Sequence, residues 1–315
     1  MKPQRLLPTR VYRFYTGGAL LGEFRGGGAA EDDSFPEDWA CSVTSASNPG
    51  RDERVAGLTR LEKGQLLRDA VASDPVGWLG EPHLERFGVT TGLLVKLLDP
   101  AERLPVHAHP SRVFAREHLG SRFGKTEAWI MVAAREQEGE AFVGLREEVA
   151  PATYRGWIER QDTDALLGSL NRVVVRPRDV LYVPAGVPHA IGGGLLIAEL
   201  QEPTDFSILC EWEGFPIRAD DAHLGLGWDV ALGALDLRAH EPVRAMPDAA
   251  AEFFWADELL EAAGRFGCVI VLEGEGAIDG VGVRAGDVLA LPAAAHEVAA
   301  TGRLRVLRSL APVAS

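Results

Sequence analysis

Short apolar runs, each ended by glycine, proline or another turn-forming residue, recur along most of the chain. They include "GLLVKLLD" (92–99), "EAWIMVAA" (127–134), "GGLLIAELQEP" (193–203) and "GCVIVLEGEGAI" (267–278). Runs of this length between turn-forming residues are typical of β-strands. Regularly spaced short strands in turn indicate a β-barrel or a β-sandwich.

Helical spacing of apolar residues is less common. The segment "SRVFAREHLG" (111–120) follows a proline and ends on a glycine, which is the arrangement expected at the two ends of a helix. Segments 63–73, 152–170 and 256–264 also place apolar residues at helical intervals. We therefore expect an all-β fold with helical additions.

Two segments of the chain repeat one another. "RPRDVLYVPAGVPHAI" (176–191) and "RAGDVLALPAAAHEV" (284–298) share an aspartate, an apolar strand, a proline five residues after the aspartate and a histidine beyond it. Such self-similarity predicts two copies of one β unit. The second copy has no His-x-His before it, so we interpret the C-terminal unit as structural and His296 as a surface or packing residue.

Composition and charge restrict the kinds of molecule that the protein is expected to bind. The chain has 315 residues, 46% of them hydrophobic and 25% charged, which is typical of a soluble globular protein. Its formal net charge of -14 argues against a nucleic-acid partner, which needs a basic face. No apolar run is long enough for a signal peptide or a membrane span, so we expect a cytoplasmic protein that acts on a small molecule and has no membrane partner. Three scattered cysteines indicate neither a disulfide framework nor a thiolate zinc site.

The segment "LPVHAHPSRVFAREHLGSRFGKTEAW" (104–129) holds two pairs of polar residues that are two positions apart. In a strand such residues point to the same face, so His107 and His109 form one pair and Lys125 and Glu127 another. Both pairs can line one pocket. The chain has only four lysines, and Lys96 and Lys125 fall in strand-like runs, although a snorkelling side chain is the alternative for either of them.

These features resemble the cupins, and more closely the type I phosphomannose isomerases in their short bacterial forms. The resemblance runs through nearly the whole chain, in the family's order: "VYRFYTGGALLGEF", "EDWACSVTSASNPG", "GLLVKLLDPAERLPVHAHP", "GKTEAW", "YVPAGVPHAI" and "IAELQEPTD". It implies a metal-bearing cupin barrel with its active site at the mouth, followed by a smaller cupin-like unit.

The resemblance and the chemistry of the residues together predict one divalent metal ion. We expect His107, His109, Glu127 and His189 to bind it, because neutral imidazoles with one carboxylate suit Zn²⁺, with Mn²⁺, Fe²⁺, Co²⁺ or Ni²⁺ as competitors. The alternative is that the histidines are ordinary core residues, whose desolvation would then be uncompensated. The predicted metal-binding domain spans residues 1–215, with N-terminal strands and helical insertions. A connecting segment, 216–250, and a metal-free unit, 251–315, follow.

The activity that the resemblance implies is the interconversion of mannose 6-phosphate and fructose 6-phosphate through an enediol. Lys125, Lys96 and Glu199 occupy positions that the family keeps in its active site. Our hypothesis is that Glu199 or Lys125 moves the proton and that Lys96 holds a substrate oxygen. For Glu199, a salt bridge within the strand layer is the alternative.

The chain departs from the family pattern at three positions. His107 stands where the family usually has glutamine, Leu209 where it has an active-site arginine, and Pro105 where it has a serine associated with the substrate phosphate. Arg112 is our candidate to replace part of the missing charge at the substrate site. The departures leave two further classes open: an isomerase of an unphosphorylated or differently substituted sugar, and another kind of cupin, either an iron oxygenase or a sugar-binding protein. The oligomeric state is not predicted.

Overall fold

The computed structural model describes residues 1–26, 31–48, 51, 55–295 and 298–313, so that His296 lies outside the described residues. The strands are β1 (Gln4–Leu6), β2 (Arg10–Val11), β3 (Glu37–Cys41), β4 (Leu94–Leu98), β5 (His107–Ala108), β6 (Glu127–Ala134), β7 (Gly139–Leu145), β8 (Leu170–Val175), β9 (Val180–Val183), β10 (His189–Ile191), β11 (Leu195–Gln201), β12 (Ile208–Leu209), β13 (Trp255–Asp257), β14 (Gly267–Ile278), β15 (Val281–Arg284), β16 (Val288–Leu291) and β17 (Ala300–Leu310).

Short helices lie between the strands. The α-helices are α1 (Ala19–Arg25), α2 (Leu67–Ser73), α3 (Pro75–Leu79), α4 (Glu81–Phe87), α5 (Arg112–His118), α6 (Pro151–Glu159), α7 (Thr163–Gly168) and α8 (Trp228–Ala231), and the 3₁₀ turns are η1 (Ala219–Asp221), η2 (Leu232–Ala234) and η3 (Asp248–Glu252). The expected mostly β fold with helical additions is confirmed. None of the described helices has the length and apolar character needed to cross a membrane.

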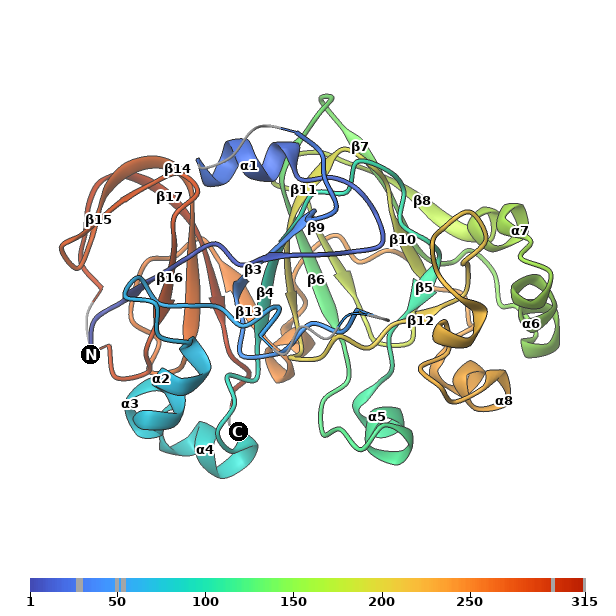
Figure 1. Cartoon of the computed structure of the whole chain (residues 1–315), viewed down its shortest axis with the longest axis horizontal. Helices are drawn as coiled ribbons and strands as arrows, with labels where there is room; N and C mark the ends of the chain where they lie inside the picture. Colours follow the sequence, from blue (N-terminus) through green and yellow to red (C-terminus); the bar gives the residue numbers. More distant parts are fainter. Residues whose placement is uncertain (27–30, 49–50, 52–54, 296–297, 314–315) are drawn as a thin grey trace.

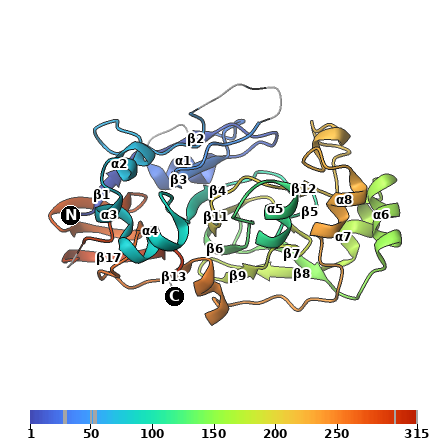
Figure 2. The same ribbon diagram turned by 90° about the horizontal axis from the view of Figure 1, so that it is seen from below.

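The described strands form three antiparallel sheets, which lie one after another along the long axis in Figure 1. The central sheet has the order β2-β3-β4-β11-β6-β9, and the histidine sheet has the order β12-β5-β10-β7-β8. The C-terminal sheet has the order β1-β16-β14-β17-β13, with β15 paired to β14. Figure 2 shows the helices α2, α3 and α4 grouped near the C-terminal sheet and α6, α7 and α8 at the opposite end.

The central sheet is buried on both faces, and the alternation of its side chains assigns each face. Val95 and Leu97 of β4 pack in a core shared with the C-terminal sheet, which includes Phe266 and Ile270. Their neighbour Leu98 packs in a second core, between the central and histidine sheets. The polar residues of β4 and β11 therefore face the histidine sheet, because successive side chains alternate between the two faces.

The N-terminal strand belongs to the sheet at the far end of the chain. Residues 4–6 of β1 pair with residues 288–290 of β16. The C-terminal sheet thus includes one strand from the segment that the sequence places in the first domain. The division at 215 and 251 stays a prediction.

Two of the expected helical segments differ from the structure. Segment 152–170 forms two helices, α6 and α7, because Gln161 between them has φ of 49° and Asp162 caps the second helix by accepting the N–H of Ala165 at 3.1 Å. The expected helix over 256–264 is wrong. Trp255 pairs with Leu310 of β17 there, and Leu259 is 54% exposed, so strand pairing replaces helix packing.

Gly286 gives a direct test of how α1 packs against the C-terminal sheet. Its φ is 88°, and a Cβ built on it would lie 1.9 Å from the carbonyl oxygen of Phe24 in α1. Gly280 has a similar φ of 78° but nothing within 4 Å of its Cβ position. We predict that Gly286→Ala lowers the free energy of unfolding by about 1–3 kcal/mol more than Gly280→Ala, because only the first adds a clash to the backbone strain. Urea denaturation measures both, and equal losses would contradict the packing.

The burial of Asp99 predicts that the free energy of unfolding depends on pH. The side chain is fully buried, and its Oδ2 accepts the N–H of Leu21 at 2.9 Å. Burial raises the pKa of this carboxyl to about 6, because that effect outweighs the hydrogen bond and the charge of Arg135. A raised folded-state pKa means that the contribution to stability is complete below about pH 4, the unfolded value, and is lost as the pH rises through about 6. Urea denaturation should therefore show that Asp99→Asn reduces the fall in stability between pH 4 and pH 7. An unchanged pH profile would contradict this.

Candidate metal centre and active site

Three histidines converge between the central and histidine sheets. His107 of β5 and His189 of β10 lie directly opposite one another on paired strands, and their Nε2 atoms are 3.0 Å apart. His109 follows β5 immediately. One ring nitrogen from each of the three can be chosen so that all lie within 4.8 Å of one another. The structure therefore brings together the three predicted histidine ligands.

Backbone carbonyls fix the tautomer of all three rings. The Nδ1 atoms of His107, His109 and His189 lie 2.8, 2.7 and 2.8 Å from the carbonyl oxygens of Pro105, Phe206 and Val187. A carbonyl oxygen can only accept, so each Nδ1 carries the proton and each Nε2 presents a lone pair. Burial is the main reason that the pKa values of His109 and His189 fall to about 3 and that of His107 falls well below its usual value. The rings are neutral at physiological pH.

Glu127 reaches the same point from the opposite sheet. Its Oε1 lies 3.1 Å from Nε2 of His109, and its Oε2 lies 3.9 Å from Nε2 of His189. The indole N–H of Trp129 donates to Oε2 at 3.1 Å. Burial alone would raise the pKa of Glu127, but His109 and Lys125 hold it well below its usual value. Oε1 is buried, and the Nζ of Lys125 is ion-paired with it at 2.9 Å.

These four side chains fit a divalent metal ion. The Nε2 lone pairs of His107 and His189 face each other without a proton between them, and the Oε1 of Glu127 lies 3.1 Å from the unprotonated Nε2 of His109. A cation held among these atoms would satisfy all of them, whereas a core without one leaves their desolvation uncompensated. Neutral imidazole and carboxylate are the ligands that Zn²⁺ and its competitors share.

Two glycines allow the backbone to bring these ligands together. A Cβ on Gly124, before Lys125, would lie 2.5 Å from the carbonyl oxygen of Pro110, so this close approach to the segment that follows β5 requires glycine. Gly186 has φ of 89° in the turn before His189, and its N–H donates to the carbonyl of His109 at 2.7 Å. The glycines of the motifs "GKTE" and "VPAGVPH" thus let these two segments pack directly against the backbone around His109 and Pro110.

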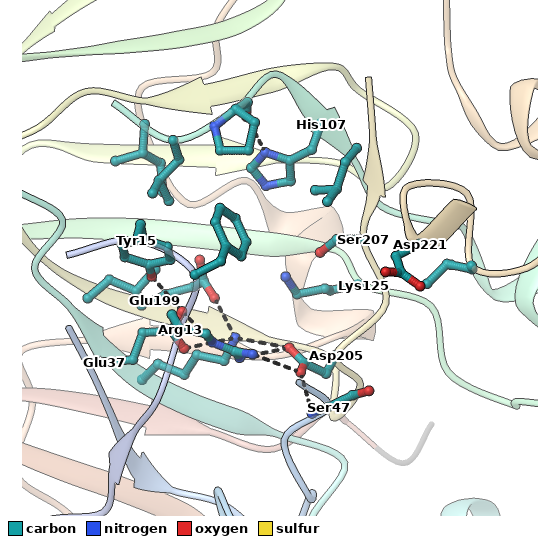
Figure 3. A pocket seen from close by; sticks show the side chains of 18 of the residues that line it. Arg13, Tyr15, Glu37, Ser47, His107, Lys125, Glu199, Asp205, Ser207 and Asp221 are labelled. Carbon is teal, nitrogen blue, oxygen red and sulfur yellow. Dashed lines mark hydrogen bonds and ion pairs between the residues drawn. The ribbon is translucent and has the colours of Figure 1, made fainter. Parts of the chain in front are cut away.

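A cavity of about 370 Å³ opens beside the histidines, and Figure 3 shows the polar side chains that line it. Its walls come from both sheets, the N-terminal segment and the segment around η1. The lining residues are Arg13, Phe14, Tyr15, Glu37, Ser47, Lys96, Leu98, Leu104, Pro105, His107, Lys125, Ile191, Glu199, Asp205, Ser207, Leu209, Asp220, Asp221, Leu224 and Gly225. The three predicted catalytic residues, Lys96, Lys125 and Glu199, all line it.

Lys96 and Glu199 face each other across β4 and β11. Their backbones are register partners, and Nζ of Lys96 lies 3.4 Å from Oε1 of Glu199. Burial, and then the charge of Glu127, raise the pKa of Glu199 to about 7 despite Lys96 and Lys125. Its Oε1 accepts no hydrogen bond among the described residues. Glu199 can therefore exchange a proton near neutral pH.

Lys125 lies between the histidines and this pair. Its Nζ is 2.9 Å from Oε1 of Glu127 and 3.1 Å from Nε2 of His109. Burial alone would lower the pKa of Lys125, but the charges of Glu127, Glu199 and Asp205 raise it above its usual value. The amine is therefore a cation and a hydrogen-bond donor at neutral pH, not a base.

Sequence reasoning missed a charged cluster on the cavity floor. Arg13 pairs with Asp205 through two nitrogens at 3.0 and 3.2 Å and with Glu37 at 2.9 Å. Glu37 also accepts the hydroxyl of Tyr15 at 2.5 Å and the indole N–H of Trp39. Burial would raise the pKa of Glu37, but Arg13 and then Lys96 outweigh it and bring the value to about 2. A glutamate inside the fully buried strand β3 is the signal that could have pointed to this cluster.

Arg112 lies apart from the cavity. Its guanidinium pairs with Glu202 and Glu252 and lies over the ring of Phe253, 4.5 Å from its centroid. It lines a separate pocket with Tyr182. The geometry gives no support to the predicted substrate contact. Leu209 and Pro105, in contrast, both line the cavity beside His107.

The relatives found by comparison with known proteins are all named as mannose-6-phosphate isomerases, two of them provisionally. The chain is 36% identical over 135 residues to the mannose-6-phosphate isomerase of Streptococcus mutans, which covers 42% of this chain and 41% of that protein. It is 34% identical over 207 residues to GmuF of Bacillus subtilis, named a probable mannose-6-phosphate isomerase, which covers 64% of this chain and 59% of that protein. The chain thus matches about two fifths to three fifths of the length of these relatives. No family model matches it.

Solved structures share the fold over nearly the whole chain. The mannose 6-phosphate isomerase of Bacillus subtilis superimposes with a TM-score of 0.73 at 22% identity, covering 98% of this chain and 99% of that one. A mannose 6-phosphate isomerase solved with zinc and yttrium superimposes with a TM-score of 0.71 at 15% identity, covering 99% and 100%. At these identities the superpositions show the fold alone.

Fold and site together define a mostly β protein with a histidine–carboxylate site for a metal ion beside a polar cavity. The chain is similar in sequence to these mannose-6-phosphate isomerases over part of its length, and it shares their fold over nearly all of it. The family that the sequence motifs resemble is thus the one that these relatives and structural neighbours are named for.

Proposed function

We propose that the protein is a metal-dependent aldose–ketose isomerase, with the chemistry of the reaction that its relatives are named for, mannose 6-phosphate to fructose 6-phosphate. One observation carries the proposal. Three unprotonated Nε2 atoms and the Glu127 carboxylate converge at one point, next to a cavity where Glu199 has a pKa of about 7. Such an arrangement suits proton transfer at a carbon beside a carbonyl.

His107, His109, Glu127 and His189 would hold the ion. Zinc is the first candidate, because a mannose 6-phosphate isomerase with this fold was solved with zinc. When bound, such an ion polarises a carbonyl oxygen and stabilises negative charge that develops there. The Nδ1–H bonds to the carbonyls of Pro105, Phe206 and Val187 would orient the three rings for this task.

Glu199 is the residue that we assign to proton transfer. The carboxylate takes the proton from C2 of the open-chain aldose, so that C1 and C2 become the enediol carbons, and it then returns a proton to C1 as the ketose carbonyl forms at C2. The hydroxyl proton of O2 passes to O1 in the course of the reaction, which leaves O1 as a hydroxyl and O2 as the carbonyl oxygen. A pKa of about 7 lets Glu199 accept and release this proton at neutral pH. Lys96, 3.4 Å away, would hold a substrate oxygen and limit the charge on Glu199.

Lys125 would act as a donor and not as a base. Its raised pKa keeps the proton on Nζ, and its position beside Glu127 and His109 brings that proton to the edge of the metal site. A donor placed there stabilises negative charge on a substrate oxygen during enediol formation. Between the two residues considered for the proton transfer, the geometry and the charges favour Glu199.

The finer description of the fold is part of the proposal. The central and histidine sheets share one core, and we take them to close as a cupin barrel over 1–215, with the metal-free cupin-like unit at 251–315. Their shared core and the passage of the chain between the two sheets support closure.

The experiment that tests the reaction uses metal-loaded protein in heavy water. We expect mannose 6-phosphate or mannose to give the ketose with deuterium at the carbon that receives the proton, because the carboxyl proton exchanges with solvent. Protein stripped of metal by a chelator is the control. Absence of both ketose formation and deuterium exchange with either sugar would refute the isomerase and favour a binding protein or another cupin activity.

A second candidate is the same chemistry on an unphosphorylated sugar. Leu209 and Pro105, which replace the family's arginine and serine, form part of the cavity wall and offer no charged or N–H donor. This observation is taken further in the next subsection.

A further inference from the structure

We propose that the cavity selects an aldose that carries no phosphate at the end far from the metal site. The inference rests on the proposed isomerase activity and specifies its class of substrate. It depends on how charge is distributed along the cavity, from the buried end beside the histidines to the exposed end at η1.

Charged side chains of both signs fill the buried end. Arg13, Lys96 and Lys125 are 8%, 2% and 5% exposed, and each is in contact with a carboxylate. Arg13 is held by Asp205 and Glu37, Lys96 lies 3.4 Å from Glu199, and Lys125 lies 2.9 Å from Glu127. Each of these cations is thus ion-paired at the buried end, so a phosphate dianion there would have to compete with a carboxylate for it.

Most of the N–H donors of Arg13 already bind other residues of the protein. Its Nε donates to Glu37, and its two terminal nitrogens donate to Asp205, with one of them also 3.4 Å from Asn48. A guanidinium has five N–H donors, and four of them are engaged in these contacts. Binding a phosphate there would require breaking the buried pair with Asp205, which is costly because it leaves a buried carboxylate unpaired.

The exposed end is apolar or acidic. Leu209 joins the two ends of the cavity, because it lies opposite His107 in the β12–β5 pair and its N–H donates to the carbonyl of Ala222, just after η1. Leu224 lines the cavity beyond it. The exposed side chains of Asp220 and Asp221 in η1 complete this end, and Figure 3 shows Asp221 set apart from the Arg13–Asp205 pair. Arg218 lies beside this end, with its guanidinium 3.7 Å from Asp220, but the described residues that line the cavity here include no cation.

A phosphate at this end would lose water without gaining a charged donor from the cavity wall. It would also face the carboxylate of Asp221 and that of Asp220, which Arg218 partly neutralises. A sugar hydroxyl loses less on transfer and can bond to Ser47 or Ser207, which both line the cavity, while its carbon atoms pack against leucine. Arg112, the candidate replacement for the missing arginine, is held by Glu202 and Glu252 outside the cavity. The described wall therefore favours the neutral sugar.

Steady-state kinetics of the metal-loaded wild-type protein on mannose and mannose 6-phosphate test the selection. We expect kcat/KM for mannose to equal or exceed that for mannose 6-phosphate. A preference for mannose 6-phosphate of about tenfold or more would overturn the inference and leave the isomerase standing. No turnover of either sugar would overturn the isomerase and remove the basis of the inference with it.

Leu209→Arg is the matched gain-of-function variant. Its guanidinium would enter the cavity beside His107, and a charge-assisted bond to phosphate should raise the ratio of kcat/KM for mannose 6-phosphate over mannose by roughly tenfold or more. Val113→Arg adds the same charge on α5, at a residue that is 74% exposed and does not line the cavity, and should leave the ratio unchanged.

Binding of inert open-chain analogues separates selection from turnover. Isothermal titration with mannitol and with mannitol 1-phosphate should show the neutral polyol binding at least as tightly to the wild type and the phosphate gaining affinity in Leu209→Arg. Tighter binding of the phosphate by the wild type, or no gain in the variant, would contradict the inference even if isomerisation is observed.

Discussion

Glu199→Gln should reduce kcat for isomerisation by about 10²- to 10⁴-fold, the usual contribution of one general acid–base group. The amide keeps the shape of the side chain but can neither take a proton from C2 nor return one to C1. Glu199 is 3% exposed and lies 3.4 Å from Lys96, so the variant keeps its place in β11 while its charge is removed. Deuterium exchange into the substrate should fall together with ketose formation.

The pH dependence of kcat/KM gives a second test of the role of Glu199. A base with a pKa of about 7 is active when deprotonated, so kcat/KM of the wild type should fall as the pH drops below about 7, and not only near 4.5 where an ordinary glutamate titrates. Glu117→Gln, on a side chain that is 69% exposed in α5, is the matched control and should keep full activity. Glu199→Gln with wild-type turnover would exclude the proton-transfer role and leave the pair with Lys96 as a structural salt bridge.

His189→Ala should abolish stoichiometric metal binding. The wild type is expected to bind one divalent ion, and losing a ligand costs more than the roughly 10- to 100-fold in affinity that follows from losing a ligand's hydrogen-bond partner. His189 is fully buried, its Nε2 lies 3.0 Å from that of His107, and its Nδ1 is fixed by the carbonyl of Val187. Zinc titration by calorimetry and metal analysis after dialysis measure the loss.

The control for this variant is His118→Ala, which removes a partly exposed imidazole from α5, away from the convergent rings. It should bind metal like the wild type. Urea denaturation checks that His189→Ala is folded when its metal content is measured. A folded His189→Ala protein that retains one tightly bound ion would contradict the assignment of His189.

Local patterns in the sequence, together with the family resemblance, predicted residues that the structure brings together and most of the strands around them. His-x-His and Lys-x-Glu are spaced for one face of a strand, and the structure places both pairs between the same two sheets. The run 92–99 contains β4, and the run 193–203 contains β11. Continuous apolar runs between turn-forming residues predict such strands because both faces of the central sheet are buried.

Other features depend on contacts between distant segments, which no local pattern records. Arg13 reaches the cavity floor because the N-terminal segment crosses the central sheet, and its partner Asp205 is 192 residues away. Arg112 has a suitable charge and a suitable place in the sequence, yet α5 directs it toward Glu202 and Glu252. The helical spacing over 256–264 is overridden by pairing of β13 with β17.

The most direct test of the metal site is an anomalous-diffraction map of crystals of the zinc-loaded protein. The account predicts one strong zinc peak in contact with Nε2 of His107, His109 and His189 and with the carboxylate of Glu127, at the point where these atoms converge. A peak elsewhere, or imidazoles that point apart with no ion between them in zinc-saturated crystals, would contradict it.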